Sequence, residues 1–351
     1  MLAARWHGRG DLRLEEIPEP SPGPGEVLVE VERCGICGTD LHEYHHGPLL
    51  MPRRPHPLTG RTPPVVMGHE FAGRVLLRGP GAEAPREGAR VTVNPCLPCG
   101  ECPQCREGKT YLCPRLGSIG FAADGAFASR VVCPASSCHL IADELPPEGA
   151  ALSEPLAACL HAWHRGGGQA GEAVLIVGAG PVGLLLLQVA RARGAEVVFV
   201  VEPYPSRREA AEALGATAVF DPGAEADFIR FLLRETGGVP LVFECVGQPK
   251  SLETALRASG RGGRVVVVGL FSEPVPVDFL RLFAQEKSIL ASCAYTDEEM
   301  GGAVALLGEG KVELGPIVSG TIRLEDIVAE GFETLSGGSS GQIKILVDPA
   351  D

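Results

Sequence analysis

A glycine-rich turn between an apolar strand and an apolar helix gives the clearest evidence on the fold. The stretch GAGPVG, residues 178–183, follows VLIV and precedes LLLLQVA. A G-x-G-x-x-G pattern in that position is typical of the first βα turn of a dinucleotide-binding fold. The first glycine allows the tight turn, the second lets the backbone approach a pyrophosphate, and the third lets helix pack on strand. The predicted contacts to the dinucleotide are Gly178, Gly180, Pro181, Val182 and Gly183.

The sequence around this turn repeats the alternation of strand and helix. Apolar runs such as EVVFVVE and LVFECVG alternate with Ala- and Leu-rich segments such as SRREAAEALGA and SLETALRASG. This alternation is typical of a doubly wound parallel sheet with helices on both faces. We therefore predict an α/β protein with a Rossmann domain over residues 154–289.

The first 150 residues have a different character and predict a β-rich domain. Short β-branched runs bounded by Gly or Pro indicate strands, and they lie at residues 25–31, 71–77, 89–93 and 128–133. The Pro-rich stretch 47–64 is too irregular for a strand and predicts a functional loop. From about residue 290 the short mixed elements return. We therefore expect the first domain to comprise residues 1–153 and 290–351.

The charge of the chain argues against a nucleic acid or a membrane as partner. Acidic residues outnumber basic residues by 44 to 31, and the formal net charge is −13. Such a surface repels phosphate backbones and anionic lipids. The start MLAARWHGRGDLRLEE lacks the apolar core of a signal peptide, and the most hydrophobic run, residues 174–190, is interrupted by Gly and Pro. We expect a cytoplasmic protein.

The residue at the end of the second Rossmann strand predicts the coenzyme. Glu202 lies 24 residues after Gly178, where a carboxylate accepts hydrogen bonds from the adenosine ribose hydroxyls. A carboxylate at this point repels a 2′-phosphate, so NAD is favoured over NADP. Arg207 and Arg208 follow closely, and an arginine can recruit that phosphate, which leaves the strictness of the preference open.

A cluster of cysteines between residues 96 and 113 indicates a metal site. Five of the 12 cysteines lie in it, namely Cys96, Cys99, Cys102, Cys105 and Cys113. In a reducing compartment, clustered cysteines bind metal more often than they form disulfides. A structural zinc takes four ligands, so one of the five is surplus. We expect the scattered cysteines to be small buried hydrophobes; they are Cys133, Cys138, Cys159, Cys245 and Cys293.

A second set of metal-ligand types occurs in VERCGICGTDLH and MGHEF. A catalytic zinc keeps an open position beside about three ligands of mixed Cys, His and carboxylate type. Cys37, His69 and Glu70 meet that description if the fold brings them together. The spacing of Cys34 and Cys37 equally fits half of a redox or structural pair, and His42 alone fits a surface histidine.

The chain resembles the zinc-dependent medium-chain alcohol dehydrogenases over essentially its whole length. The resemblance is carried, in this order, by CGICGTDLH, GHE, the cysteine lobe at about residues 94–115 and GAGPVG. The stretches AARWHGRGDLRLEEI, DLHEYHHGPLLMP and PHPLT resemble the 2,3-butanediol dehydrogenase branch in particular. This resemblance implies a GroES-like β-rich catalytic domain, a Rossmann domain and two zinc ions per subunit. It implies NAD-dependent oxidation of a secondary alcohol of a small diol or polyol, with 2,3-butanediol as first candidate, in a homodimer or homotetramer.

The resemblance also implies roles for individual residues near the catalytic zinc. Cys37 and His69 match zinc ligands. Glu70 matches a carboxylate that ligates zinc in some members and only neighbours it in others. Glu154 matches one that ligates the metal or holds its water. Thr39 matches the hydroxyl of a proton relay, and His42 matches its imidazole.

The remaining implied sites lie in the lobe and the Rossmann domain. The lobe spacing matches Cys99, Cys102, Cys105 and Cys113 as ligands, which makes Cys96 the surplus cysteine, and Cys34 matches a position that is not a ligand. The resemblance places two segments beside the nicotinamide, one with Glu244, Cys245, Val246 and Gly247 and one with Val268, Gly269 and Leu270. Glu202 and Arg207 are expected on the adenosine side.

Four alternatives share part of this pattern. Sorbitol-like polyol dehydrogenases and L-threonine 3-dehydrogenases also carry CGICGTDxH and GHE. A non-catalytic zinc- and nucleotide-binding protein is a rival of another class, but the joint presence of Cys37, Thr39, His42, His69 and Glu70 argues against it. A zinc-ribbon nucleic-acid module is disfavoured by the negative charge and by the missing basic, aromatic-interleaved stripe.

Overall fold

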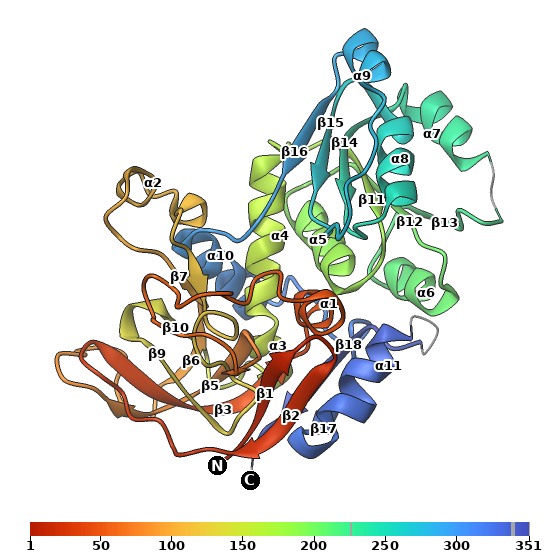
Figure 1. The fold of residues 1–351 in the computed structure, drawn as a ribbon. Coiled ribbons are helices and arrows are strands. Elements are labelled where there is room, and N and C mark those ends of the chain that lie inside the picture. The colour runs from red at the N-terminus through yellow and green to blue at the C-terminus, as the bar shows by residue number, and fades with distance from the viewer. Residues whose placement is uncertain (225–226, 338–340, 351) are drawn as a thin grey trace. The chain divides into compact units, whose positions relative to one another are not determined.

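The computed structural model describes residues 1–224, 227–337 and 341–350, and the chain forms two compact units. The first unit comprises Met1–Ala157, Ala294–Gly310 and Val318–Asp351, and the second comprises Ala158–Cys293 and Lys311–Ile317. In Figure 1 the first unit is drawn in red to yellow-green and again in blue, because the end of the chain returns to it.

The boundaries between the units differ by a few residues from those expected. Each falls four residues later than expected, at 157/158 and 293/294. At the first, helix α4 (Ser153–Arg165) continues without a break from one unit into the other. The segment Lys311–Ile317 was not expected in the second unit. The side chain of Gln188 holds it there, since its amide donates to the carbonyl of Glu313 at 3.0 Å and accepts from the Glu313 N–H at 2.6 Å.

The first unit is β-rich, and its strands form three sheets. They are β1 (Leu2–Gly8), β2 (Asp11–Glu16), β3 (Glu26–Gly35), β4 (Val65–Val66), β5 (Glu70–Arg78), β6 (Arg90–Val93), β7 (Cys96–Leu97), β8 (Gly117–Ser118), β9 (Arg130–Pro134), β10 (Cys138–Leu140), β17 (Val318–Arg323) and β18 (Lys344–Asp348). The main sheet has the order β10-β6-β5-β3-β18-β17, with β9 also paired to β3. Smaller sheets join β2-β1-β4 and β7-β8.

The α-helices of the first unit differ in length, from four to 12 residues. Besides the start of α4, they are α1 (Gly38–His46), α2 (Pro103–Arg106), α3 (Pro147–Ala151), α10 (Asp297–Gly308) and α11 (Glu333–Ser336). Single turns add η1 (Thr110–Leu112), η2 (Ala135–Ser137), η3 (Leu324–Asp326) and the π-helical η4 (Ile327–Phe332). Residues 47–64 form the predicted irregular loop between α1 and β4.

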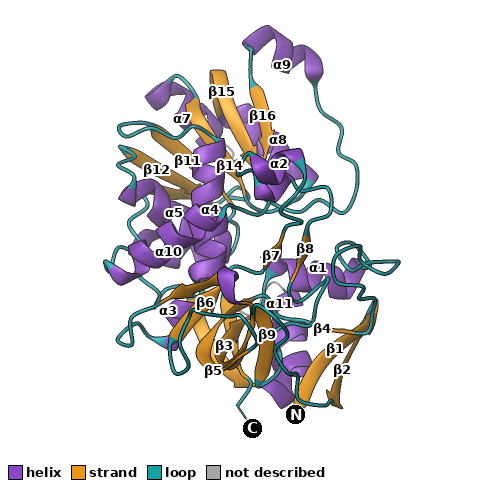
Figure 2. Ribbon diagram, turned by 90° about the vertical axis from the view of Figure 1, so that its left-hand side faces the viewer, coloured by secondary structure: helices purple, strands orange, loops and turns teal. Residues whose placement is uncertain are grey.

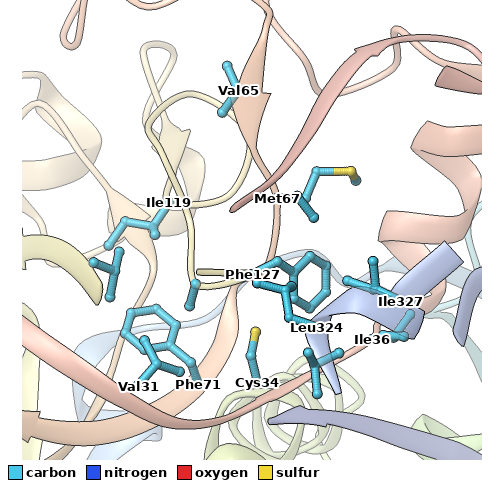
Figure 3. Close-up of a cluster of buried hydrophobic side chains, with 14 of the residues drawn as sticks. Val31, Cys34, Ile36, Val65, Met67, Phe71, Ile119, Phe127, Leu324 and Ile327 are labelled. Carbon is cyan, nitrogen blue, oxygen red and sulfur yellow. The ribbon is translucent and has the colours of Figure 1, made fainter. Parts of the chain in front are cut away.

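One hydrophobic core lies beneath the main sheet of the first unit. Val27, Val29 and Val31 alternate along β3, so their side chains point to the same face and enter this core. Figure 3 shows Cys34 in the same core, among side chains that include Phe71 and Phe127. Cys34 is completely buried, and burial raises the pKa of its thiol well above the usual value. Cys34 is thus a packing residue.

The second unit is a doubly wound Rossmann domain, as predicted. Its six strands are all parallel, in the order β13-β12-β11-β14-β15-β16. They comprise β11 (Ala173–Val177), β12 (Val197–Val201), β13 (Ala218–Phe220), β14 (Val239–Glu244), β15 (Ser259–Val267) and β16 (Ser288–Ala291). Figure 2 shows these strands with helices packed beside them.

The connecting helices alternate with these strands along the chain. They are α5 (Pro181–Ala192), α6 (Pro205–Ala213), α7 (Phe228–Thr236), α8 (Pro249–Ala258) and α9 (Phe279–Gln285). The direction of winding reverses between β11 and β14, and such a reversal leaves a crevice at the carboxyl ends of the strands. Within the described ranges, none of the helices combines the length and apolarity needed to cross a bilayer.

Candidate metal and dinucleotide sites

Strand register brings together three metal-ligand side chains of the first unit. Gly35, at the end of β3, pairs with Glu70, at the start of β5. Cys37 follows that end and His69 precedes that start, so the antiparallel pairing places the two segments side by side. Cys37, His69 and Glu70 each offer a ligand atom, and these atoms lie within 4.8 Å of one another. His69 is 6% exposed and Glu70 is 1% exposed.

A buried carboxylate that the sequence analysis did not single out connects two of these residues. Asp40, in the first turn of α1, accepts a hydrogen bond from the backbone N–H of Cys37 at 2.9 Å. Its other oxygen lies 3.3 Å from Nδ1 of His69. Histidines that bind metal usually direct their second ring nitrogen at such a carboxylate, which leaves Nε2 for the metal. Asp40 therefore binds the Cys37 backbone and faces the ring of His69.

The charges of this cluster depend on one another. Burial disfavours a charged His69, but the charges of Asp40 and Cys37 outweigh it and raise the pKa of His69 well above its usual value. Burial, together with the charge of Glu70, raises the pKa of the Cys37 thiol. A divalent cation among these groups would favour the thiolate and the neutral imidazole. The donor set of sulfur, nitrogen and oxygen suits zinc.

A buried lysine also meets Glu70 and was not predicted. Lys344, at the start of β18, is 1% exposed. Its Nζ forms an ion pair with Oε2 of Glu70 and donates to the carbonyl of Ile36 at 2.8 Å. Burial disfavours its charge, but Glu70 and Cys37 outweigh that effect and raise the pKa of Lys344. Glu70 thus faces a cation on one side and the Cys37–His69 pair on the other.

Glu154 lies outside the three-residue group of donor atoms. It occupies the first turn of α4, and its Oε1 accepts a hydrogen bond from the hydroxyl of Tyr295 at 2.8 Å. Burial raises the pKa of Glu154 to about 7, with His69 opposing the shift and Glu70 adding to it. Tyr295, which is 1% exposed, was not predicted as a site residue.

Thr39 and His42 lie on one face of α1, because residues three apart on a helix are neighbours. The hydroxyl of Thr39 lies 3.6 Å from the sulfur of Cys37. Nδ1 of His42 is buried and has no hydrogen-bond partner. Burial, together with His46 and His45, lowers the pKa of His42. The imidazole is therefore neutral and able to accept a proton at neutral pH.

The cysteine lobe gathers four sulfur atoms. Those of Cys99, Cys102, Cys105 and Cys113 lie within 4.8 Å of one another. Backbone N–H groups donate to three of them: Cys102 to Cys99, Cys105 to Cys102, and Cys99 to Cys113, each at 3.4 Å. Such donors stabilise thiolates, and four thiolates suit a structural zinc. Cys96 is outside this group and lies in β7.

The other cysteines behave differently from one another. Cys133 and Cys159 are buried, and Cys138 and Cys245 are half-buried. Cys293 is exposed, so the prediction of a buried hydrophobe was wrong for this residue. It lies just after β16, which is an edge strand of the Rossmann sheet.

The glycine turn of the second unit has the geometry of a pyrophosphate site. Gly178 has φ +99°, which favours glycine. A Cβ on Gly183 would lie 1.9 Å from the carbonyl oxygen of Gly178, so only glycine fits there. Gly180 is the N-cap of α5 and Pro181 is its first residue. The free N–H groups at this helix start suit an anion. Val182 is the second residue of this first turn.

Glu202 is held against this turn. It is 2% exposed, and its carboxylate accepts from the N–H of Ala179 at 2.7 Å and from that of Tyr204 at 3.0 Å. Each oxygen keeps a second lone pair for a ribose hydroxyl. Arg208 pairs with Asp221 at 3.2 Å. Arg207 lies near the turn, since Nη1 would be 4.0 Å from a Cβ on Gly180.

Two further turns follow β14 and β15 and touch each other. The first contains Cys245 and Val246, and the second contains Val268, Gly269 and Leu270. A Cβ on Gly269 would lie 2.2 Å from the backbone nitrogen of Gly247. Val246 also packs against Gly178, because a Cβ on Gly178 would lie 2.5 Å from a methyl group of Val246. These turns lie at the carboxyl ends of β14 and β15, and β14 is next to the reversal of winding.

Comparison with known proteins agrees with both units. Residues 23–143 match the family of alcohol dehydrogenase GroES-like domains, and residues 181–309 match the zinc-binding dehydrogenases. The chain is 36% identical to the (R,R)-butanediol dehydrogenase of Neisseria gonorrhoeae, with 99% of each chain covered. It is 37% identical to that of Bacillus subtilis over 99% of this chain and 100% of the other. The chain therefore belongs to the zinc-dependent medium-chain alcohol dehydrogenases.

Other relatives and solved structures extend this result. The L-threonine 3-dehydrogenase of Thermococcus kodakarensis is 37% identical, with 94% of this chain and 93% of that one covered. The crystal structure of 2R,3R-butanediol dehydrogenase from Bacillus subtilis has a TM-score of 0.92 at 36% identity, with 99% of each chain covered. A zinc-binding dehydrogenase from Sinorhizobium meliloti, bound to NADP, has a TM-score of 0.89 at 35% identity, also with 99% of each covered. The predicted family and fold class are confirmed.

Proposed function

We propose that the protein is a zinc- and NAD-dependent dehydrogenase that oxidises 2,3-butanediol to acetoin, and reduces acetoin in reverse. The match over 99% of its length to two (R,R)-butanediol dehydrogenases carries this proposal. The grouping of Cys37, His69 and Glu70 supports a catalytic metal in the same chain. In this proposal the first unit carries the alcohol site and the second unit binds the coenzyme.

Two zinc ions would be held by separate donor sets. Cys37, His69 and Glu70 would hold the catalytic ion, and Cys99, Cys102, Cys105 and Cys113 would hold the structural one. When bound, the catalytic zinc supplies a Lewis acid that favours loss of the alcohol proton. Asp40 keeps His69 oriented, and Lys344 balances the charge of Glu70. Glu154, held by Tyr295, would orient water or the second hydroxyl of a diol.

The proton of the alcohol would leave by way of α1. Thr39 would accept a hydrogen bond from the substrate hydroxyl at Oγ1, and His42 would pass the proton to solvent. The lowered pKa of His42 keeps its imidazole neutral at neutral pH, so that it holds a proton only briefly before passing it on. Both residues lie on the same face of one helix, which supports a shared path.

NAD would occupy the second unit and supplies the hydride acceptor. The glycine turn would bind the pyrophosphate, and Glu202 would accept hydrogen bonds from the adenosine ribose. We propose NAD rather than NADP because Glu202, held by two backbone N–H groups, would repel a 2′-phosphate. Arg207, which lies near Gly180, would bind the pyrophosphate. The turns after β14 and β15 would hold the nicotinamide.

We further propose a homo-oligomer, dimer or tetramer, in the cytoplasm. Strand β16 is an edge of the Rossmann sheet, and an unpaired edge is commonly covered by another strand. The same strand of a second copy can pair with it across a two-fold axis. Helix α9, next to it in the chain, exposes Phe279 by 73%, Leu280 by 77% and Phe283 by 82%. Four reduced cysteine ligands fit a cytoplasmic location.

L-threonine 3-dehydrogenase activity is the second candidate. The identity of 37% to the enzyme of Thermococcus kodakarensis equals that to the butanediol dehydrogenase of Bacillus subtilis. Fewer residues of this chain are matched, 94% against 99%. Sorbitol-like polyol oxidation is a third candidate because it uses the same motifs.

Initial rates of NADH formation by the zinc-loaded protein test these candidates. (R,R)-2,3-butanediol, meso-2,3-butanediol, sorbitol and L-threonine are compared at equal concentrations. We expect a butanediol to give the highest kcat/KM. Preference for L-threonine or sorbitol would replace the proposed substrate and keep the mechanism. Activity on none of the four, with zinc and NAD bound, would contradict the proposed substrate class.

A further inference from the structure

A buried glutamate at the end of β14 is not used by any step described above. Glu244 is 0% exposed and is the last residue of the strand. It pairs in register with Val177 of β11 and with Val267 of β15. Glu244 therefore lies at the carboxyl edge of the parallel sheet, next to the reversal of winding where ligands bind in such folds.

One oxygen of Glu244 holds the first of the two nicotinamide turns. Oε1 accepts hydrogen bonds from the backbone N–H groups of Val246 and Gly247, each at 2.9 Å, and from the hydroxyl of Ser251 at 2.6 Å. Ser251 lies in the first turn of α8. Three donors to one oxygen favour a charged acceptor, because charge-assisted hydrogen bonds are about twice as strong as neutral ones.

The backbone and second oxygen of Glu244 hold the other turn. Its carbonyl accepts from the N–H groups of Val268 and Gly269 at 2.8 and 2.9 Å. Its Oε2 is buried and has no hydrogen-bond partner. A Cβ on Gly269 would lie 2.7 Å from this Oε2, so the second turn packs directly on the carboxylate. One residue thus connects both turns.

An unpaired buried oxygen is costly, which argues that the carboxylate has a role beyond packing. The salt bridges among the described residues do not include Glu244, so its charge is offset only by N–H and O–H dipoles. The nicotinamide ring of oxidised NAD is a cation. A buried anion beside the turns that would enclose that ring favours its binding.

We propose that Glu244 is the positioning residue of the nicotinamide half-site, holding the turns after β14 and β15 together with a buried carboxylate. This inference rests on the proposed NAD dependence. In this proposal the two halves of the coenzyme depend on different residues. The glycine turn and Glu202 bind the adenosine half, and Glu244 positions the turns that bind the nicotinamide half. Loss of Glu244 should therefore weaken NAD and spare a ligand that has no nicotinamide.

The test compares the binding of NAD and of ADP-ribose to wild type and E244Q, by calorimetry with the zinc-loaded protein. Glutamine keeps the shape and removes the charge. We expect the Kd for NAD to rise about tenfold or more and the Kd for ADP-ribose to change less than about twofold. Equal changes for both ligands, or no change, would overturn the inference. Failure of the wild type to bind NAD would overturn the proposed function itself.

Two further variants keep the test decisive. Ser251→Ala removes one of the three donors to Oε1 and should give a smaller loss for NAD alone, even if E244Q folds poorly. Glu253→Gln makes the same chemical change at an exposed position of α8, where the carboxylate meets Arg257 at 3.5 Å. It should leave both Kd values and kcat unchanged. A loss of NAD affinity in E253Q equal to that in E244Q would refute a specific role of Glu244.

Discussion

Replacing Lys344 by methionine tests how the metal cluster balances its charge. Methionine keeps the apolar stem of the side chain and removes the ammonium group. In the wild type, Nζ contacts Glu70 and the carbonyl of Ile36, and the residue is 1% exposed. Removing one member of a buried ion pair costs about 3–5 kcal/mol, because the other charge stays buried without a partner. We expect that loss in the zinc-free protein.

Zinc should reduce the effect of this substitution. If Glu70 ligates the metal, the cation takes over the role of Lys344, and the loss falls to that of an unpaired Ile36 carbonyl, about 1–3 kcal/mol. Lys344 also competes with zinc for Glu70, so K344M should bind the catalytic zinc more tightly. Chelation removes the lobe zinc from wild type and variant alike. The difference between their free energies of unfolding therefore reports on the catalytic site.

Urea unfolding of wild type and K344M, with and without zinc, measures these quantities. The double variant E70Q/K344M removes both charges and should recover most of the stability that K344M loses without zinc. Lys250→Met, at an exposed position of α8, is the matched control and should change stability by less than about 0.5 kcal/mol. A loss for K344M that is the same with and without zinc would refute the idea that Glu70 is shared between lysine and metal.

Three further predictions concern the proposed sites. Cys37→Ser should abolish turnover and leave NAD binding measurable by fluorescence titration, whereas loss of both would indicate misfolding. His42→Ala should lower kcat about tenfold to hundredfold near pH 6–7 and progressively less towards pH 9, where solvent accepts the proton more readily; a loss independent of pH would contradict the relay. Cys102→Ser should reduce the zinc content by one ion per chain, while Cys96→Ser should retain both ions, as metal analysis would show.

The fold was predictable because its signals are local. The parallel sheet of the second unit follows from apolar runs that alternate with amphipathic helices, and GAGPVG gives the first turn. Helix α1 was not predicted, because GTDLHEYHH has no apolar periodicity. It forms where Asp40 binds the Cys37 N–H. The exposed Cys293 was also missed, since exposure at a sheet edge depends on which strand is outermost.

The candidate site was predictable only in part, because its contacts join residues that are far apart in the sequence. Ligand types at Cys37, His69 and Glu70 are visible in the sequence, but their meeting depends on the register of β3 against β5. Lys344 reaches Glu70 across 274 residues, and Tyr295 reaches Glu154 across 141. A lysine in the run IKILV is unusual for a buried strand, and that was the only local signal for Lys344. Glu244 was placed beside the nicotinamide by the family resemblance, but its hydrogen bonds to both turns had no local signal in the sequence.

The surroundings of the two carboxylates assign them different tasks. Glu70 shares a group of donor atoms with Cys37 and His69, and it also forms an ion pair with Lys344. Glu154 lies outside that group, and burial raises its pKa to about 7. A carboxyl group that exchanges its proton near neutral pH is better suited to orient water or a hydroxyl than to ligate an ion. We therefore infer that Glu70 is the direct ligand and that Glu154 acts on the groups that approach the metal.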